Sequence, residues 1–234
     1  MGPESIPMQS PPPAEDVGST PWQDRRHDVA DLAALRALYD LPGDTALAKE
    51  VDHVHAVYRP FIEAAPFAAL ATLGPAGLDI SPRGDAPGFV HVADARTLLL
   101  PDRRGNNRID SLRNVLADPR VALLFMVPPV NETLRVNGRA AISIDPALCA
   151  RFAIDGKPAR SVLVISIETV FLQCSRALLR SRLWQPATWA ERAALPTAGS
   201  MLQQASAARA DGEPAVDGAA YDRELPVRVA GSLY

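Results

Sequence analysis

Residues 67–172 form a succession of short apolar segments, most of them joined by turns too short to hold a crossover helix. The clearest segment is 134–142, in which apolar side chains alternate with Arg135, Asn137 and Arg139, as in a strand with one polar face. Antiparallel strands can be joined by tight turns, whereas parallel strands need long crossovers. The spacing therefore favours an antiparallel barrel over an alternating β–α–β sheet.

Short strands make up most of this region. The predicted strands are 67–73, 78–81, 88–92, 97–100, 121–127, 134–142 and 161–172. A short helix is predicted over 107–117, where Ile109, Leu112 and Leu116 recur at helical spacing. The other predicted helices are one capped by Asp28 and ended by Pro42, one over 45–63, and one over 188–209 interrupted near Pro196.

The organisation along the chain is simple. Residues 1–27 include six prolines and almost no apolar periodicity, which predicts a disordered tail. The remainder, 28–234, is expected to form a single domain, with residues 205–220 loosely ordered. At 47% hydrophobic and 22% charged residues, the 234-residue chain can bury a sizeable core.

Several classes of function are disfavoured by composition. A net charge of −3 gives no general basic field for nucleic acid. No apolar run approaches the roughly 20 residues that a membrane span needs, and the N-terminus does not resemble a secretory signal. Two cysteines are too few for a zinc ribbon, and His53 and His55 are a poor metal pair at a spacing of two. We therefore expect a cytoplasmic protein without a metal site.

The first motif that carries chemistry is 100–108, Leu-Pro-Asp-Arg-Arg-Gly-Asn-Asn-Arg, between an apolar strand and the first turn of a predicted helix. Free amides and the helix dipole make such a position suited to anions, and Arg108 can grip a phosphate with two hydrogen bonds. An ordinary Asn-capped helix with solvated arginines is the alternative interpretation.

The second motif is 80–85, Ile-Ser-Pro-Arg-Gly-Asp, which ends a strand. Arg83 is expected at the strand end, and Gly84 would let the backbone approach a flat ligand. A surface turn with an internal Arg83–Asp85 contact is the alternative.

The third motif, 174–184, places Arg180 and Trp184 on one side of either a strand or a helix. A cation beside an indole can form a wall for an aromatic, anionic cofactor. A Trp in the core or in a dimer interface is an equally good interpretation.

Together these segments resemble the flavin-binding split barrels related to pyridoxamine 5'-phosphate oxidase. The order of motifs is kept over about residues 45–190. The matching segments are 59–62, 71–74, 81–85, 100–108, 118–121, 132–140 and 180–184.

The resemblance implies a mainly β fold with flanking helices: a six-stranded antiparallel Greek-key split barrel that forms a homodimer, with one FMN at each end of the interface. By position in the family pattern, all implied site residues are cofactor-binding and none is assigned as catalytic. They are Ser81, Arg83, Gly84, Asp85, Leu100, Pro101, Asp102, Asn106, Asn107, Arg108, and, from the neighbouring subunit, Arg180 and Trp184.

The resemblance also implies a function. The chain lacks the Arg-x-His segment that holds the substrate phosphate in the vitamin-oxidising enzyme, so an FMN-dependent oxidoreductase of another small, aromatic or heterocyclic substrate is expected. The chemistry would then be largely that of the flavin, with no side-chain nucleophile required. Two alternatives stay open: a deazaflavin-dependent reductase, and a non-catalytic flavin- or haem-binding carrier or sensor.

Overall fold

The computed structural model describes residues 25–209 and 215–232, and the chain falls into two compact units, 1–43 and 44–234. In the first unit the described elements are η2 (Arg25–His27) and α1 (Leu32–Arg36). The helix cap is Asp31, whose carboxylate accepts from the Ala34 amide at 2.8 Å, so the predicted cap at Asp28 is wrong. The predicted tail lies outside the described residues up to residue 24, and its boundary after residue 27 stays a prediction.

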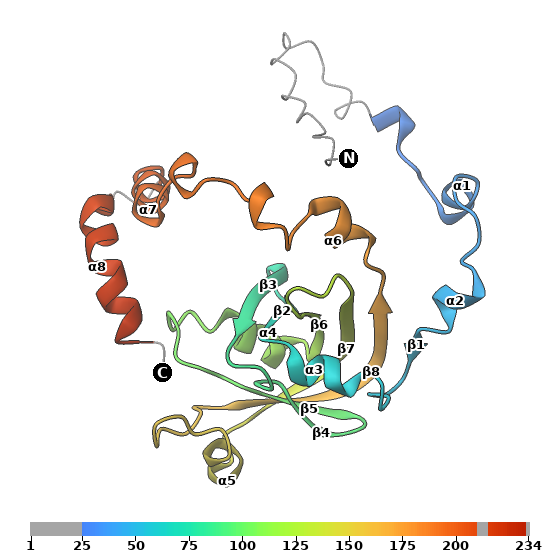
Figure 1. The fold of residues 1–234 in the computed structure, drawn as a ribbon, viewed down its shortest axis with the longest axis horizontal. Helices are drawn as coiled ribbons and strands as arrows, with labels where there is room; N and C mark the ends of the chain where they lie inside the picture. The colour runs from blue at the N-terminus through green and yellow to red at the C-terminus, as the bar shows by residue number, and fades with distance from the viewer. Residues whose placement is uncertain (1–24, 210–214, 233–234) are drawn as a thin grey trace, which may run out of the picture. The chain divides into compact units, whose positions relative to one another are not determined.

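The second unit is built on one antiparallel sheet (Figure 1). Its strands are β1 (Glu50–Val51), β2 (Phe67–Gly74), β3 (Gly77–Gly84), β4 (His91–Asp94), β5 (Thr97–Pro101), β6 (Arg120–Met126), β7 (Thr133–Ser143) and β8 (Val162–Gln173). They pair in the order β3-β2-β6-β7-β8-β5-β4, and β1 pairs with β8. All seven predicted strands are confirmed, with each end within three residues of its prediction.

The second unit also contains α-helices and short 3-10 turns. They are α2 (Asp44–Leu47), α3 (Arg59–Ala64), α4 (Asp110–Ala117), α5 (Pro146–Ala150), α6 (Arg176–Ser181), η3 (Pro186–Thr188), η4 (Arg192–Ala194), α7 (Ala198–Ala207) and α8 (Gly218–Ala230). Of these, α3 and α4 pack against the sheet. The single helix predicted over 45–63 is wrong, because residues 50–51 pair with β8 and Pro60 sits in the first turn of a separate helix.

The C-terminal prediction needs a similar correction. The helix expected over 188–209 is limited to α7, preceded by two short 3-10 turns. Residues from Gly218 onward, expected to start in a loose segment, form α8, whose first turn is capped by the Asp217 carboxylate on the Ala220 amide at 2.9 Å. α5 and α6 were not predicted, and both are only one to two turns long.

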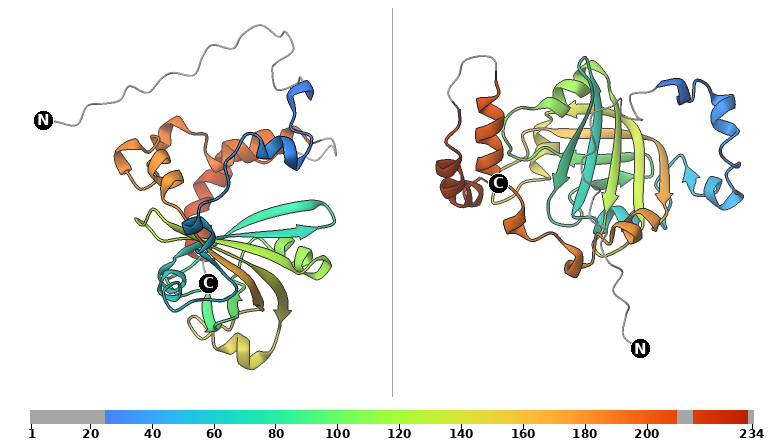
Figure 2. Two further views of the ribbon diagram at one scale, coloured as in Figure 1. Left: turned by 90° about the vertical axis from the view of Figure 1, so that its right-hand side faces the viewer. Right: turned by 90° about the horizontal axis from the view of Figure 1, so that it is seen from above.

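The core is enclosed by the curled sheet, with α3 and α4 against it (Figures 1 and 2). β2 alternates between buried and partly exposed residues, as a half-buried strand should. Fully buried side chains converge from five elements: Ile62, Leu70, Phe125, Leu134 and Ile165. At the β-bulge next to Asn137, a Cβ on Gly138 would collide with the Ser166 carbonyl, so only glycine fits there.

These contacts fix α4, the element that matters most for the site. Its Val115 is buried in the core, and Leu112 packs against the same cluster. The Asn114 amide donates to the Thr72 hydroxyl on β2 at 3.0 Å. The N-terminus of α4 is therefore held at a defined place beside the sheet.

The predicted architecture, mainly antiparallel β with flanking helices, is confirmed. The hydrogen-bonded series from β3 to β4 has seven strands, one more than the six-stranded barrel expected. Its two edge strands, β3 and β4, are not paired with each other in the described part of the chain. Of the helices described, every one falls short of the length and apolar content needed to cross a membrane.

Candidate functional site

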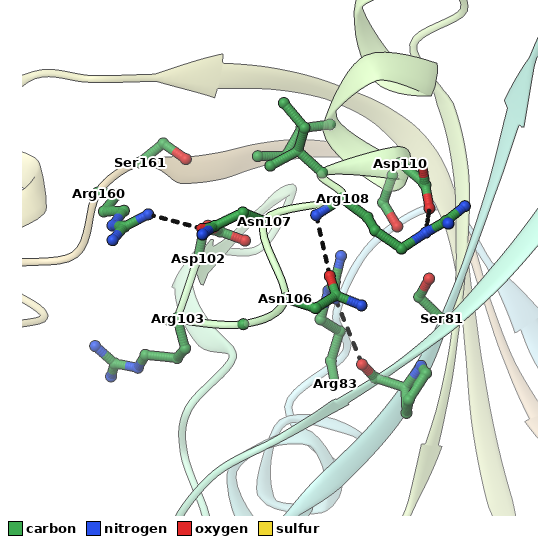
Figure 3. A pocket seen from close by; sticks show the side chains of 15 residues that line it. Ser81, Arg83, Asp102, Arg103, Asn106, Asn107, Arg108, Asp110, Arg160 and Ser161 are labelled. Carbon is green, nitrogen blue, oxygen red and sulfur yellow. Dashed lines mark hydrogen bonds and ion pairs between the residues drawn. The ribbon is translucent and has the colours of Figure 1, made fainter. Parts of the chain in front are cut away.

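A cavity of about 550 Å³ opens at the N-terminus of α4, and we call it the α4 pocket (Figure 3). Its volume falls in the range of small-molecule sites, about 300–1,000 Å³. The lining comes from the end of β3, the β5–α4 loop, the first turn of α4 and the two residues before β8. Its residues are Ser81, Pro82, Arg83, Asp102, Arg103, Gly105, Asn106, Asn107, Arg108, Ile109, Asp110, Ser111, Leu112, Arg160 and Ser161.

Sheet pairing brings these distant segments together. β5 and β8 are antiparallel neighbours with Pro101 opposite Val162, and the Asp102 amide extends the pairing by donating to the Ser161 carbonyl at 2.9 Å. The loop that follows β5 therefore leaves the sheet next to Arg160.

The β5–α4 loop has unusual backbone geometry. Asn107 and Ile109 have φ of 59° and 52°, in the left-handed region. Asn tolerates this region, but a β-branched residue rarely adopts it. These two residues explain why α4 begins at Asp110 and not at Asn107 as predicted.

The first turn of α4 presents unused hydrogen-bond donors to the pocket. The helix has no side-chain cap, and the Arg113 amide donates to the Ile109 carbonyl at 2.9 Å. The amides of Asp110, Ser111 and Leu112 precede this bond and have no acceptor within the helix. Together with the helix dipole they favour an anion.

Ser111 adds an independent sign that a ligand belongs here. Its residue is only 3% exposed, and its hydroxyl is buried without a hydrogen-bond partner in the described structure. Buried polar atoms nearly always have partners, so an unpartnered hydroxyl in a residue that lines the pocket is a candidate donor to a ligand atom.

Cations surround this turn (Figure 3). Arg83 lines the pocket from β3 and donates a long hydrogen bond to the neighbouring Pro82 carbonyl at 3.5 Å. Arg108 is exposed and pairs with Asp110 at 2.7 Å. Arg160 donates to the Asn107 side-chain oxygen at 3.1 Å. An exposed ion pair such as Arg108–Asp110 is weak and exchanges readily for a phosphate.

Arg103 has a structural role in the pocket. Its guanidinium donates to the buried Asp85 carboxylate at 2.9 Å and to the Phe152 carbonyl at 2.6 Å. These bonds tie the β5–α4 loop to the segment after β3 and to the segment after α5. The alternative of an internal Arg83–Asp85 contact is therefore replaced by a contact with Arg103.

Asp102 is the half-buried carboxylate of the pocket. Burial raises the pKa of Asp102, while the nearby charges of Arg83 and Arg160 oppose the increase. A carboxylate among cations can accept hydrogen bonds from ligand hydroxyls, and it also repels an anion placed beside it.

The structure brings six of the twelve predicted residues into the α4 pocket. They are Ser81, Arg83, Asp102, Asn106, Asn107 and Arg108. Leu100 and Pro101 are buried in the barrel, Gly84 ends β3 against Phe67, and Asp85 holds Arg103. None of these four lines the pocket.

The third motif lies elsewhere in the chain. Arg180 is exposed on α6, and the Trp184 indole donates to the Val130 carbonyl at 2.8 Å. Neither lines the α4 pocket of its own chain. Their role at a pocket of a neighbouring subunit stays a prediction.

Sequence reasoning missed Ser111, Arg160 and Ser161. Ser111 lies three residues after the expected anion motif, and its signal is a polar residue in the first turn of an amphipathic helix. Arg160 and Ser161 carried no local signal, because only the β5–β8 pairing places them here. No group of three or more His, Cys, Asp or Glu that could hold a metal occurs among the residues described.

Comparisons with known proteins cover curated sequences and solved structures. No curated protein sequence gives a significant match. Among solved structures, HupZ of Group A Streptococcus is 18% identical, with a TM-score of 0.41 over 50% of this chain and 92% of its own. A candidate pyridoxamine 5'-phosphate oxidase from Lactobacillus delbrueckii is 19% identical, with a TM-score of 0.42 over 52% and 95%. An F420 reductase is 22% identical, with a TM-score of 0.38 over 50% and 98%.

The decisive match is to a family profile. The profile of pyridoxamine 5'-phosphate oxidase matches residues 54–174, more than half of the chain, from the segment before α3 to the end of β8. The matched segment contains the whole α4 pocket. This chain belongs to the pyridoxamine 5'-phosphate oxidase-related family of flavin-binding split barrels.

Proposed function

We propose that this protein is an FMN-dependent oxidoreductase of a small aromatic or heterocyclic substrate, and that the α4 pocket holds the FMN phosphate. The observation that carries the proposal is the orphan Ser111 hydroxyl beside the uncapped first turn of α4. Family membership supports a flavin as the cofactor class.

The residues of the pocket fit a flavin phosphate and its sugar chain. Three free amides and the Ser111 hydroxyl can donate to phosphate oxygens, and Arg83 and Arg108 supply positive charge. Asp102 can accept from hydroxyls of the ribityl chain. When bound, FMN supplies the redox chemistry, and the protein positions the ring and shapes the face open to substrate.

We further propose that the protein acts as a homodimer with the cofactor at the interface. On β3, Leu78 and Ile80 are 86% and 68% exposed and lie on the same face as Pro82. Pro82 lines the α4 pocket, so this apolar face runs directly into the site. A second copy seated there would shield the apolar side chains and complete the open side of the pocket.

The first test is the absorbance spectrum of the freshly purified protein, with the released cofactor identified by mass. Oxidised-flavin bands and released FMN are expected, followed by turnover with a nicotinamide reductant or dioxygen. A deazaflavin in the released fraction would replace FMN as cofactor, and a bound flavin without turnover would make the protein a carrier or sensor. A colourless protein that also fails to bind added FMN would refute the proposal.

A further inference from the structure

A second hollow of about 220 Å³ adjoins the α4 pocket, and we call it the side pocket. It shares Asp102, Arg103 and Arg160 with the α4 pocket, so the two cavities meet along the same stretch of loop. Its other lining residues come from the β5–α4 loop and from the segment before β8: Arg104, Ile154, Lys157, Pro158 and Ala159.

The charge of the side pocket is unbalanced. Arg104, Lys157 and Arg160 have no ion pair with a carboxylate among the residues described, and Arg103 is neutralised by Asp85. Asp102 is the single carboxylate in the lining. Three positive charges against one negative leave an excess of two in a chain whose net charge is −3.

The three unpaired cations of the side pocket are exposed, but they line one hollow together with less exposed apolar residues. Lys157 is placed by a tight turn, in which its amide and carbonyl bond to those of Ile154 at 2.9 and 3.0 Å. Ala159 is buried and Ile154 is partly buried, so apolar residues line the same hollow as the cations. Charges held near apolar walls act more strongly than charges in open solvent.

We propose that the side pocket is a second anion subsite, which takes a phosphate or carboxylate group lying beyond the first phosphate. The proposal rests on the proposed function, because the first phosphate belongs to the flavin in the α4 pocket. The second anionic group belongs either to a cofactor extended past its first phosphate or to a separate anionic ligand. Both sources present the same chemistry to Arg104 and Lys157.

The test is a fluorescence titration of flavin-free protein with riboflavin, FMN and FAD, in which FAD carries the additional phosphate. The Arg104→Ala/Lys157→Ala double variant removes two exposed cations of the side pocket. Arg151→Ala is the matched control, since Arg151 is an exposed cation of the neighbouring segment that lines neither pocket. The FMN-loaded protein is titrated separately with inorganic pyrophosphate.

If the subsite serves an extended cofactor, FAD binds the native protein more tightly than FMN. The double variant then weakens FAD binding about tenfold and leaves FMN within about twofold, and the difference shrinks as salt rises from about 0.05 M to about 0.5 M. If the subsite serves a separate ligand, FAD has no advantage, but pyrophosphate binds the FMN-loaded protein about tenfold more weakly in the double variant than in the native protein.

Two results separate failure of the subsite from failure of the proposed function. If native protein binds FMN but the double variant changes neither FAD nor pyrophosphate binding beyond the Arg151→Ala control, the second subsite is refuted and the proposed function stands. If native protein binds no flavin, the proposed function is refuted. Pyrophosphate binding to the native and double-variant chains then decides the subsite alone: a weakened double variant supports it, and equal binding refutes it.

Discussion

The helices of the second unit begin in two contrasting ways. α5, α7 and α8 have N-cap side chains, Asp145, Thr197 and Asp217, that accept from an amide of the first turn at 2.9–3.0 Å. α3, α4 and α6 lack a side-chain cap, and of these three α4 begins after a residue in the left-handed conformation, Ile109. A cap satisfies a backbone donor from within the chain. In the proposed function, the uncapped start of α4 keeps its donors for a ligand, at some cost to the stability of the folded chain.

The largest effect is expected for Arg108→Ala. If Arg108 exchanges Asp110 for a phosphate, the variant loses roughly 1.5–3 kcal/mol of FMN binding free energy, the range of a charge-assisted hydrogen bond. Fluorescence titration of the flavin-free protein with FMN measures this loss of binding free energy. Arg113→Ala is the control, because Arg113 is exposed on α4 outside the pocket. Equal affinities of the two variants would remove Arg108 from the site.

Ser111→Ala is expected to act in opposite directions on binding and on stability. Without ligand, the variant loses a buried hydroxyl that has no partner, so its free energy of unfolding is unchanged or higher. With FMN, the lost donor lowers the binding free energy by about 1–1.5 kcal/mol. Urea denaturation without FMN measures the change in stability, and denaturation with FMN measures the loss of binding free energy. A variant destabilised without ligand would show that the hydroxyl already has a partner in the free protein.

For the capped helix α8, we expect an effect on stability and none on FMN binding. Asp217→Ala removes the cap of α8 and is expected to lower the free energy of unfolding by about 1 kcal/mol. FMN affinity should stay at the native value, since Asp217 lines neither pocket. Thermal or urea denaturation provides the measurement, and Asp217→Asn, which preserves capping, is the matched control. A loss of FMN affinity in Asp217→Ala would contradict the division between structural and ligand-binding helix starts.

Particular elements show which parts of the fold and of the candidate site can be predicted from the sequence. The alternation of 134–142 was enough to predict β7, and the anion motif before α4 was found from 100–108. The prediction of one helix over 45–63 is wrong because the pairing of Val51 with Val170 is a tertiary contact, which local sequence does not show. For the same reason, local sequence does not predict that Arg160 lines the site, because only the β5–β8 pairing brings it there.

Ile109→Gly is expected to stabilise the free protein. Glycine adopts a φ of 52° without the steric penalty of a β-branched residue, although it adds entropy to the unfolded chain. The balance raises the free energy of unfolding by roughly 0.5–1 kcal/mol. Ile109→Val, which keeps the branched Cβ, should not share this gain. A less stable glycine variant would show that Ile109 is not strained at this position.

The smallest effect concerns Asp102. Because burial raises the pKa of Asp102 in the folded chain, the ionised carboxylate destabilises the fold at pH 7, and this penalty disappears as the pH falls below the ordinary Asp pKa of about 4. Asp102→Asn should therefore raise the free energy of unfolding at pH 7 by up to about 0.5 kcal/mol, a modest value because the side chain is partly solvated. The difference between native and variant should vanish at about pH 3.5.

The same substitution sharpens the assignment of the α4 pocket as an anion site. Removing a carboxylate that faces the phosphate lowers repulsion, so Asp102→Asn should bind FMN about twofold more tightly at pH 7. Titration of the phosphate itself is common to both proteins and cancels in their ratio. Riboflavin, which has no phosphate, should not gain from the substitution. A weaker affinity of Asp102→Asn for both flavins would instead show that Asp102 accepts from ribityl hydroxyls strongly enough to outweigh its repulsion of the phosphate.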